Sequence, residues 1–248
     1  MQVNGHQYNI RGILFDKDGT LLDLHLLWSS WFHQLLVKIK NKQPGVMFSD
    51  GEVAKDLGVD IEQHLILPRG PLAIGTMQDS AIIVALHLYR QKLPWNEAVQ
   101  TVRNSMEDVN ATIDWNRYLQ PLQGLISFLE KASQNDVQMA VVTSDDTDIA
   151  EEHLHLLNIH HFFHSIIGSD QIDRPKPFPD IGHKACQKLM VDPAHVAVIG
   201  DTNGDMNLGD NLNAKVNIGI VAHDDPNASH LTDADHIIHD YGELSIHT

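Results

Sequence analysis

Residues 10–20 have the sequence IRGILFDKDGT, and this stretch predicts the architecture of the chain. The apolar residues 13–15 do not alternate with polar ones, which is typical of a strand covered on both faces. Two carboxylates, Asp16 and Asp18, follow where this strand should end. A buried strand that leads directly into acidic residues indicates a sheet with polar groups gathered at its carboxyl edge.

Short apolar runs of the same kind recur in the second half of the chain. Together with the first run, they predict strands over Ile10–Phe15, Val137–Val142, Ser165–Ile167, Val196–Ile199, Val216–Val221 and His236–Ile238. Helical spacing between them predicts helices over Leu125–Ala132, Asp148–Leu157, Ile181–Met190 and Asp205–Leu212. This alternation of strand and helix predicts an α/β fold with a Rossmann-like parallel sheet and helices on both faces.

The long segment between the first two predicted strands has a different pattern. Residues of about 24–115 show helical periodicity throughout, for example at Trp28, Trp31 and Phe32. A structureless loop of this length would be unusual in a compact domain. We therefore expect an all-helical domain, residues 23–117, inserted into an α/β core of residues 1–22 and 118–248. The aromatic residues are expected to form the core of this insert.

Composition excludes several classes of function. The 248 residues include 17 Lys plus Arg and 33 Asp plus Glu, which gives a formal net charge of −16. Such an acidic chain is not expected to bind nucleic acid or an anionic membrane surface, because both are bound through clustered basic residues. The single cysteine, Cys186, excludes an intramolecular disulfide, and the first residues lack a signal-peptide pattern. We expect a cytoplasmic protein.

Other chemically useful side chains follow the later predicted strands. Thr143 and Ser144 come after the second strand, and Asp201 and Asp205 come after the fourth. Lys176 lies in a proline-rich turn, RPKPFPD at 174–180. Strand ends of a parallel sheet share one edge, so these groups should meet there. Carboxylate oxygens select a hard cation such as Mg²⁺, and the hydroxyl and ammonium donors suit a phosphoryl group.

Four motifs in this order resemble those of the haloacid dehalogenase superfamily. They are DKDGT at 16–20, TS at 143–144, RPKP at 174–177 and GDTNGD at 200–205. The resemblance is to the branch that includes phosphoglycolate phosphatases and β-phosphoglucomutases, and the helical insert falls where this branch carries its cap domain. The resemblance implies hydrolysis of a small phosphate monoester through an aspartyl-phosphate.

The resemblance also implies roles for individual residues. Asp16 would be the nucleophile, and Asp18 would protonate the leaving oxygen and then activate water. Thr143 would bind the phosphoryl oxygens, and Lys176 would neutralise negative charge. Mg²⁺ would be held by Asp16, the backbone carbonyl of Asp18, Asp201 and Asp205.

Substrate contacts are expected from the residues around these motifs. Gly19 and Thr20 in the first turn, together with Ser144, would lie beside the phosphoryl group, and Arg69 in the insert could reach a substrate carboxylate. The second motif departs from the family pattern, because Asp145 and Asp146 follow where asparagine is common. Since an acid beside a phosphate is unfavourable, both are expected to point away and to complement the N-terminus of the next helix.

Two alternatives remain open. A phosphomutase of the β-phosphoglucomutase type would use the same residues but return the phosphoryl group to a sugar. A non-enzymatic phosphate-binding or receiver-like signalling domain could also combine acids, a hydroxyl and a lysine on such a sheet. The substrate itself stays open among 2-phosphoglycolate, sugar phosphates and nucleotide monophosphates, and so does the oligomeric state.

Overall fold

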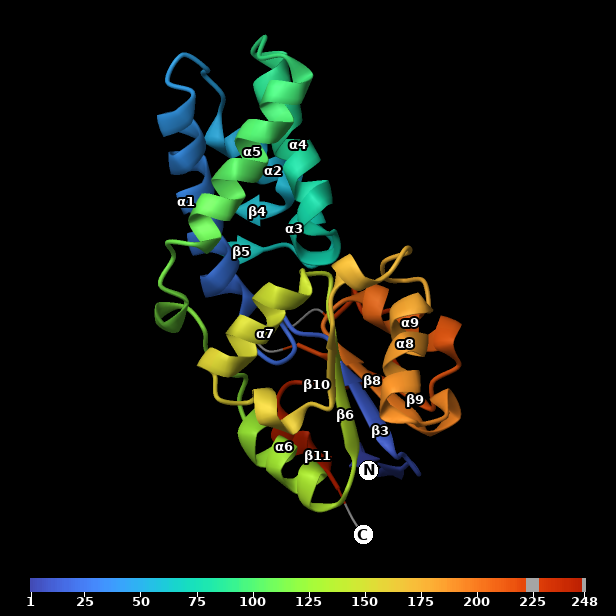
Figure 1. Ribbon diagram of the computed structural model, residues 1–248. Helices are drawn as coiled ribbons and strands as arrows, with labels where there is room; N and C mark the ends of the chain where they lie inside the picture. The colour runs from blue at the N-terminus through green and yellow to red at the C-terminus, as the bar shows by residue number, and fades with distance from the viewer. Residues whose placement is uncertain (222–227, 247–248) are drawn as a thin grey trace. The chain divides into compact units, whose positions relative to one another are not determined.

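The computed structural model describes residues 1–221 and 228–246. The chain forms two compact units (Figure 1). The first unit comprises Met1–Asp23 and Leu119–Thr248, and the second comprises Leu24–Tyr118. The insert predicted from the sequence spans residues 23–117.

A six-stranded parallel sheet forms the centre of the first unit. Its strand order is β10-β9-β8-β3-β6-β7, so the first strand of the chain lies in the middle. The strands are β3 (Gly12–Phe15), β6 (Gln138–Val142), β7 (Ser165–Ile167), β8 (Val196–Gly200), β9 (Val216–Ile220) and β10 (His236–Ile238). The predicted α/β fold and all six predicted strands are therefore confirmed, with ends shifted by no more than two residues.

Helices cover both faces of this sheet, as predicted (Figure 1). They are α6 (Leu125–Gln134), α7 (Thr147–Leu156), α8 (Asp180–Leu189) and α9 (Asn203–Leu212). Alternate residues of β3 face opposite sides: Ile13 and Phe15 pack against α6 and α7, whereas Leu14 packs against α8 and α9. The side chains of all three are fully buried, and each such burial contributes roughly 1.5–3 kcal/mol.

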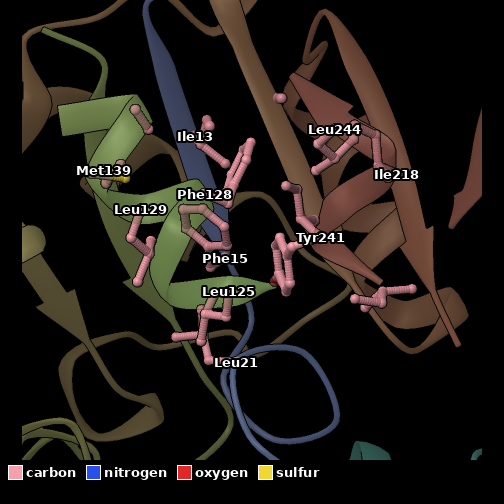
Figure 2. Packing of buried hydrophobic residues seen from close by; sticks show 14 of the residues in the cluster. Ile13, Phe15, Leu21, Leu125, Phe128, Leu129, Met139, Ile218, Tyr241 and Leu244 are labelled. Atoms are coloured by element: carbon pink, nitrogen blue, oxygen red, sulfur yellow. The ribbon is translucent and has the colours of Figure 1, made fainter. Parts of the chain in front are cut away.

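The two ends of the first unit's chain add structure that the sequence did not predict. β1 (Gln2–Val3) pairs antiparallel with both β2 (His6–Gln7) and β11 (Leu244–Ser245). Tyr241, just before β11, is buried against the rings of Phe15 and Phe128, with ring centroids 6.4 and 5.4 Å away (Figure 2). The C-terminal segment therefore completes the core on this face of the sheet.

The second unit is mainly helical. Its helices are α1 (Leu24–Lys42), α2 (Asp50–Leu57), α3 (Pro71–Ile74), α4 (Met77–Arg90) and α5 (Trp95–Asn110). Trp28, Trp31 and Phe32 are buried within it, as predicted, and the Trp31 indole donates to Asn110 at 2.7 Å. The prediction of an all-helical insert missed one short antiparallel pair, β4 (Val59–Asp60) with β5 (Leu65–Ile66).

Short 3₁₀ turns complete the described structure. They are η1 (Trp115–Arg117), η2 (His160–Phe162), η3 (Ser169–Gln171), η4 (Pro193–His195) and η5 (Tyr241–Glu243). In the described part of the chain, every helix is too short or too polar to cross a lipid bilayer.

Candidate active site at the carboxyl edge of the sheet

Three neighbouring strands deliver the predicted site residues to one edge. β3 lies between β6 and β8, and Asp16, Thr143 and Asp201 follow these strands directly. The hydrogen-bond ladder continues one residue further, because the Asp16 amide donates to Ile199 at 2.9 Å and the Thr143 amide donates to Ile167 at 3.0 Å. The backbone of the site residues is therefore fixed by the sheet itself.

The turn after β3 is built around Gly19. Gly19 has φ +77°, in the left-handed region that glycine adopts without strain, and its amide donates to Leu22 at 2.8 Å. The Thr20 amide donates to Lys17 at 3.3 Å. Both amides are thus used inside the turn. The substrate-binding roles of Gly19 and Thr20 stay predictions. Thr20 is fully buried, and its hydroxyl makes a long contact of 3.5 Å with Asp201.

The proline-rich turn that carries Lys176 is closed by its own side chains. Arg174 donates to both carboxylate oxygens of Asp180, at 3.0 and 2.8 Å, and lies over the ring of Phe178. Asn211 on α9 donates to the Pro177 carbonyl at 2.9 Å and ties the turn to that helix. These contacts fix the backbone on both sides of Lys176.

Lys176 joins two of the predicted site acids. Its ammonium group donates to Asp16 and also to Asp205 Oδ1, at 2.7 Å for the latter. The other oxygen of Asp205 accepts from the amide and hydroxyl of Thr202, at 3.1 and 2.6 Å, and so caps α9. This arrangement needs Gly200, because a Cβ there would lie 2.2 Å from the Cβ of Asp205.

The acids around Lys176 are short of positive charge. Burial raises the pKa of Asp16 to about 6 despite the opposing charge of Lys176. Burial also raises the pKa of Asp201 well above its usual value, and the charges of Asp16 and Asp205 add to that rise. Burial alone would lower the pKa of Lys176, but Asp16 and Asp205 outweigh it and raise this pKa. One ammonium thus faces three carboxylates.

This acidic group fits a divalent cation. Asp16, Asp201 and Asp205 each offer a carboxylate oxygen within 4.8 Å of the others. After Lys176 offsets one carboxylate, two negative charges remain, which is the charge that a divalent ion neutralises. Oxygen-only ligands of this kind suit Mg²⁺.

Asp18 lies in a different environment from Asp16. Its Oδ1 accepts from Lys17 at 2.7 Å, and Lys17 also pairs with Asp145 at 3.0 Å and contacts His153 Nδ1 at 3.0 Å. Burial raises the pKa of Asp18 to about 7, and Asp145 adds to this rise against the effect of Lys17. Burial would lower the pKa of Lys17, but Asp145 and Asp18 outweigh it and raise this pKa to about 12.

Comparison with known proteins places this geometry in a family. The sequence model of the haloacid dehalogenase-like hydrolases matches residues 10–209, which is most of the chain and includes all four motifs. The chain belongs to this family. It is similar to the pyrophosphatase PpaX of Oceanobacillus iheyensis, with 23% identity over 236 residues that cover 95% of each protein.

Solved structures share the fold of this chain. A predicted phosphoglycolate phosphatase from Haemophilus somnus has a TM-score of 0.70 and 17% identity, over 96% of this chain and 97% of that chain. A β-phosphoglucomutase from Clostridium difficile has a TM-score of 0.68 and 18% identity, over 95% and 93%. The resemblance found in the sequence is therefore confirmed at the level of family and fold.

The three remaining predicted site residues, Thr143, Ser144 and Arg69, lie at different places in the structure. Thr143 is buried at the end of β6, and its hydroxyl accepts from the Asp145 amide at 3.2 Å. Ser144, next to it, is half-buried. Arg69 is exposed and belongs to the second unit, where it lies between β5 and α3. The substrate-binding roles of Ser144 and Arg69 stay predictions.

The expectation for the acids after Ser144 was wrong in part. Asp145 is buried and pairs with Lys17 instead of capping the next helix, and its charge raises the pKa of Asp18. Asp146 is exposed, but its side chain does not cap α7. Asp170 does so instead, because its Oδ1 accepts from the amide and the hydroxyl of Thr147, both at 2.7 Å.

Sequence patterns also missed Lys17 and His153. A lysine between two acids in a turn resembles an ordinary solvated charge, and His153 falls on the expected course of a helix. Yet both side chains are fully buried. The available signal was the position of Lys17 two residues after Phe15, at the end of a strand buried on both faces.

Proposed function

We propose that this hydrolase is a Mg²⁺-dependent phosphatase that cleaves a small phosphate monoester through a phosphorylated Asp16. The observation that carries the proposal is the separation of the two aspartates. Asp16 accepts a hydrogen bond from Lys176 and lies in the cluster with Asp201 and Asp205. Asp18, two residues away, accepts a hydrogen bond from Lys17 instead. Two carboxylates in different environments can take two different roles.

The pKa values suit those roles. At neutral pH a pKa of about 6 leaves Asp16 mainly ionised, as a nucleophile must be, and bound Mg²⁺ would favour ionisation further. A pKa of about 7 lets Asp18 hold a proton and also release it, which is the property of a general acid that later serves as a base.

The reaction follows from these positions. An Asp16 oxygen attacks phosphorus, the bond from phosphorus to the ester oxygen breaks, and that oxygen leaves with the electron pair and the proton of Asp18. Water then attacks phosphorus of the aspartyl-phosphate while Asp18 takes its proton. The bond to Asp16 breaks, and inorganic phosphate and the ionised carboxylate of Asp16 are formed.

The remaining residues stabilise charge. The ammonium of Lys176 lies beside Asp16, where negative charge of the phosphoryl group would gather, and Thr143 offers a hydroxyl at the next strand end. Mg²⁺, held by Asp16, Asp201 and Asp205 with the Asp18 carbonyl, would neutralise charge on the transferred group and help to orient it.

The substrate is proposed as a class. The relatives carry names for pyrophosphate and phosphoglycolate hydrolysis, and all of these are small phosphate compounds. The second unit would act as a cap that excludes water and recognises the part of the substrate beyond the phosphate, with Arg69 as one candidate contact. We further propose that the enzyme works in the cytoplasm without a nucleic-acid partner.

Phosphate release tests the proposal. The panel comprises 2-phosphoglycolate, a hexose phosphate, a nucleoside monophosphate, pyrophosphate and an aryl phosphate, each with EDTA and then with excess Mg²⁺. The wild type should release phosphate with Mg²⁺, and Asp16→Asn should not. Full activity after chelation would contradict the metal site. Isomerisation of the hexose phosphate without phosphate release would favour the phosphomutase alternative.

A further inference from the structure

Lys17 is the most unusual charged residue of the first unit. Its side chain is fully buried, although lysine is almost never fully buried unless it is paired. We propose that Lys17 is a positioning residue that fixes the carboxylate of Asp18 for proton transfer. This inference rests on the proposed role of Asp18 as the general acid of the phosphatase.

The ammonium group of Lys17 hydrogen-bonds to two side chains and forms an ion pair with a third. The partners are Asp18 Oδ1 at 2.7 Å, Asp145 Oδ2 at 3.0 Å and His153 Nδ1 at 3.0 Å. Because an ammonium group can only donate, Nδ1 of His153 must be the acceptor, so the proton of the neutral ring is on Nε2. The three acceptors come from the turn after β3, the loop after β6 and helix α7.

Two of these acceptors are themselves anchored. The Asp145 amide donates to the Thr143 hydroxyl at 3.2 Å, and its carbonyl accepts from Ser169 at 2.8 Å. His153 is fully buried on α7, whose first amide is capped by Asp170. Lys17 therefore ties the short Asp18 side chain to two parts of the fold that do not depend on the turn.

The ammonium also takes the place that a metal ion would need. Asp18, Asp145 and His153 offer ligand atoms within 4.8 Å of one another, which is a possible metal group. Lys17 is in contact with all three, so a cation could enter only by displacing it. The fold thus contains its own fixed cation beside the proposed general acid.

The lysine holds one oxygen of Asp18 and leaves proton exchange to the other. The Asp18 side chain keeps 18% of its surface exposed, whereas Lys17 has none. Without Lys17, the carboxylates of Asp18 and Asp145 would face each other with like charge, and Asp18 would turn away from the leaving oxygen. A misplaced general acid affects one kind of substrate more than another.

Leaving-group dependence is the readout that separates positioning from folding. An alkyl phosphate needs a proton on its leaving oxygen, whereas a dinitrophenyl phosphate leaves as a stable anion. We expect Lys17→Met to lower kcat/KM about 10²-fold on the alkyl ester, the lower end of the usual range for general acid catalysis. On the aryl ester it should lower kcat/KM several-fold at most, because kcat/KM reports the steps up to phosphoryl transfer to Asp16 and not the later attack of water. Asp18→Asn should give the same pattern.

Two further variants keep the test decisive. Lys17→Met/Asp145→Leu removes one buried charge of each sign, so it leaves less uncompensated charge than the single variant and is expected to fold where that variant fails. Lys184→Met is the matched control, because Lys184 donates to the Gln171 carbonyl at 2.9 Å outside the site. Thermal melting and Mg²⁺ binding are measured on every variant.

Each outcome has a fixed meaning. A selective loss on the alkyl ester in a folded Lys17 variant supports the inference. A wild-type kcat/KM on that ester, equal losses of kcat/KM on both esters, or failure of both Lys17 variants to fold would overturn it and leave a structural role. The wild type is assayed on both esters before any variant is made. If it releases phosphate from neither ester, that result contradicts the proposed function itself.

Discussion

The ammonium nitrogen of Lys176 lies 2.7 Å from Asp205 Oδ1, and the same nitrogen donates to Asp16. Asp16 is 160 residues earlier in the chain and Asp205 is 29 residues later. One buried lysine therefore joins the end of β3 to the start of α9. This link places positive charge where the nucleophile and the acidic group meet, and several predictions depend on it.

Replacing Lys176 with methionine should lower both activity and stability. Loss of a charge-stabilising donor typically lowers kcat about 10²–10³-fold. Breaking a buried ion pair leaves its partner uncompensated and costs about 3 kcal/mol of unfolding free energy in the metal-free protein. Phosphate release and urea unfolding measure these two effects. Lys184→Met should show neither, and an active Lys176→Met would remove this lysine from the mechanism.

Replacing Asp201 with asparagine should abolish stabilisation by Mg²⁺. The wild-type melting temperature should rise with Mg²⁺ concentration, because the ion binds the folded state alone. Asp201→Asn removes one of three carboxylates and should leave the melting temperature almost independent of Mg²⁺. The control is Asp136→Asn, an exposed acid with φ +56° that asparagine also tolerates. An equal rise of the melting temperature with Mg²⁺ in both variants would contradict a Mg²⁺ site at Asp201.

The metal-free protein should lose stability as pH rises from about 4 to 8. Asp16 and Asp18 have pKa values raised to about 6 and 7, so the folded state binds more protons than the unfolded state within this range. Their contribution is therefore complete below the unfolded pKa near 4 and is lost as pH passes the folded values. Mg²⁺ should restore stability most strongly near pH 8.

Urea unfolding at several pH values, with EDTA and with Mg²⁺, checks this prediction. Asp201→Asn removes one of the buried acids and should flatten the pH dependence of the metal-free protein. A metal-free wild type that becomes more stable towards pH 8 would contradict the charge imbalance described for the site.

Removing the hydroxyl of Tyr241 should destabilise the first unit. This hydroxyl donates to the Thr20 carbonyl at 3.0 Å, although the two residues are 221 positions apart. Tyr241→Phe keeps the ring packing and leaves a buried carbonyl without this donor, which costs about 1–2 kcal/mol. Tyr89→Phe, at a half-exposed position, should cost under about 0.5 kcal/mol. Equal losses of unfolding free energy in the two variants, measured by urea unfolding, would contradict a stabilising role for this hydrogen bond.

Much of this fold was predictable because it depends on local patterns. Apolar runs such as residues 13–15 are specific to strands buried on both faces, and acids directly after them must lie at the carboxyl edge. The order of the motifs then indicated which acids would meet. The structure brings Asp16, Lys176, Asp201 and Asp205 together as the sequence predicted.

The unpredicted parts depend on contacts between distant residues. Burial of Lys17 is favourable because Asp145 and His153, more than 120 residues later, supply its acceptors. β1, β2 and β11 have two residues each, too few for any periodicity. The position of Asp145 was not predicted, because its partner Lys17 lies more than 120 residues earlier in the chain.

The central claim is that Asp16 carries the phosphoryl group, and mass spectrometry tests it directly. Enzyme mixed with excess ester and Mg²⁺ is quenched in acid within one turnover, digested and searched for a phosphorylated peptide. We predict one phosphoryl group on Asp16, sensitive to hydroxylamine and absent from Asp16→Asn. Phosphate release at the full rate with Asp16 never modified, or with the label on another residue, would contradict the account.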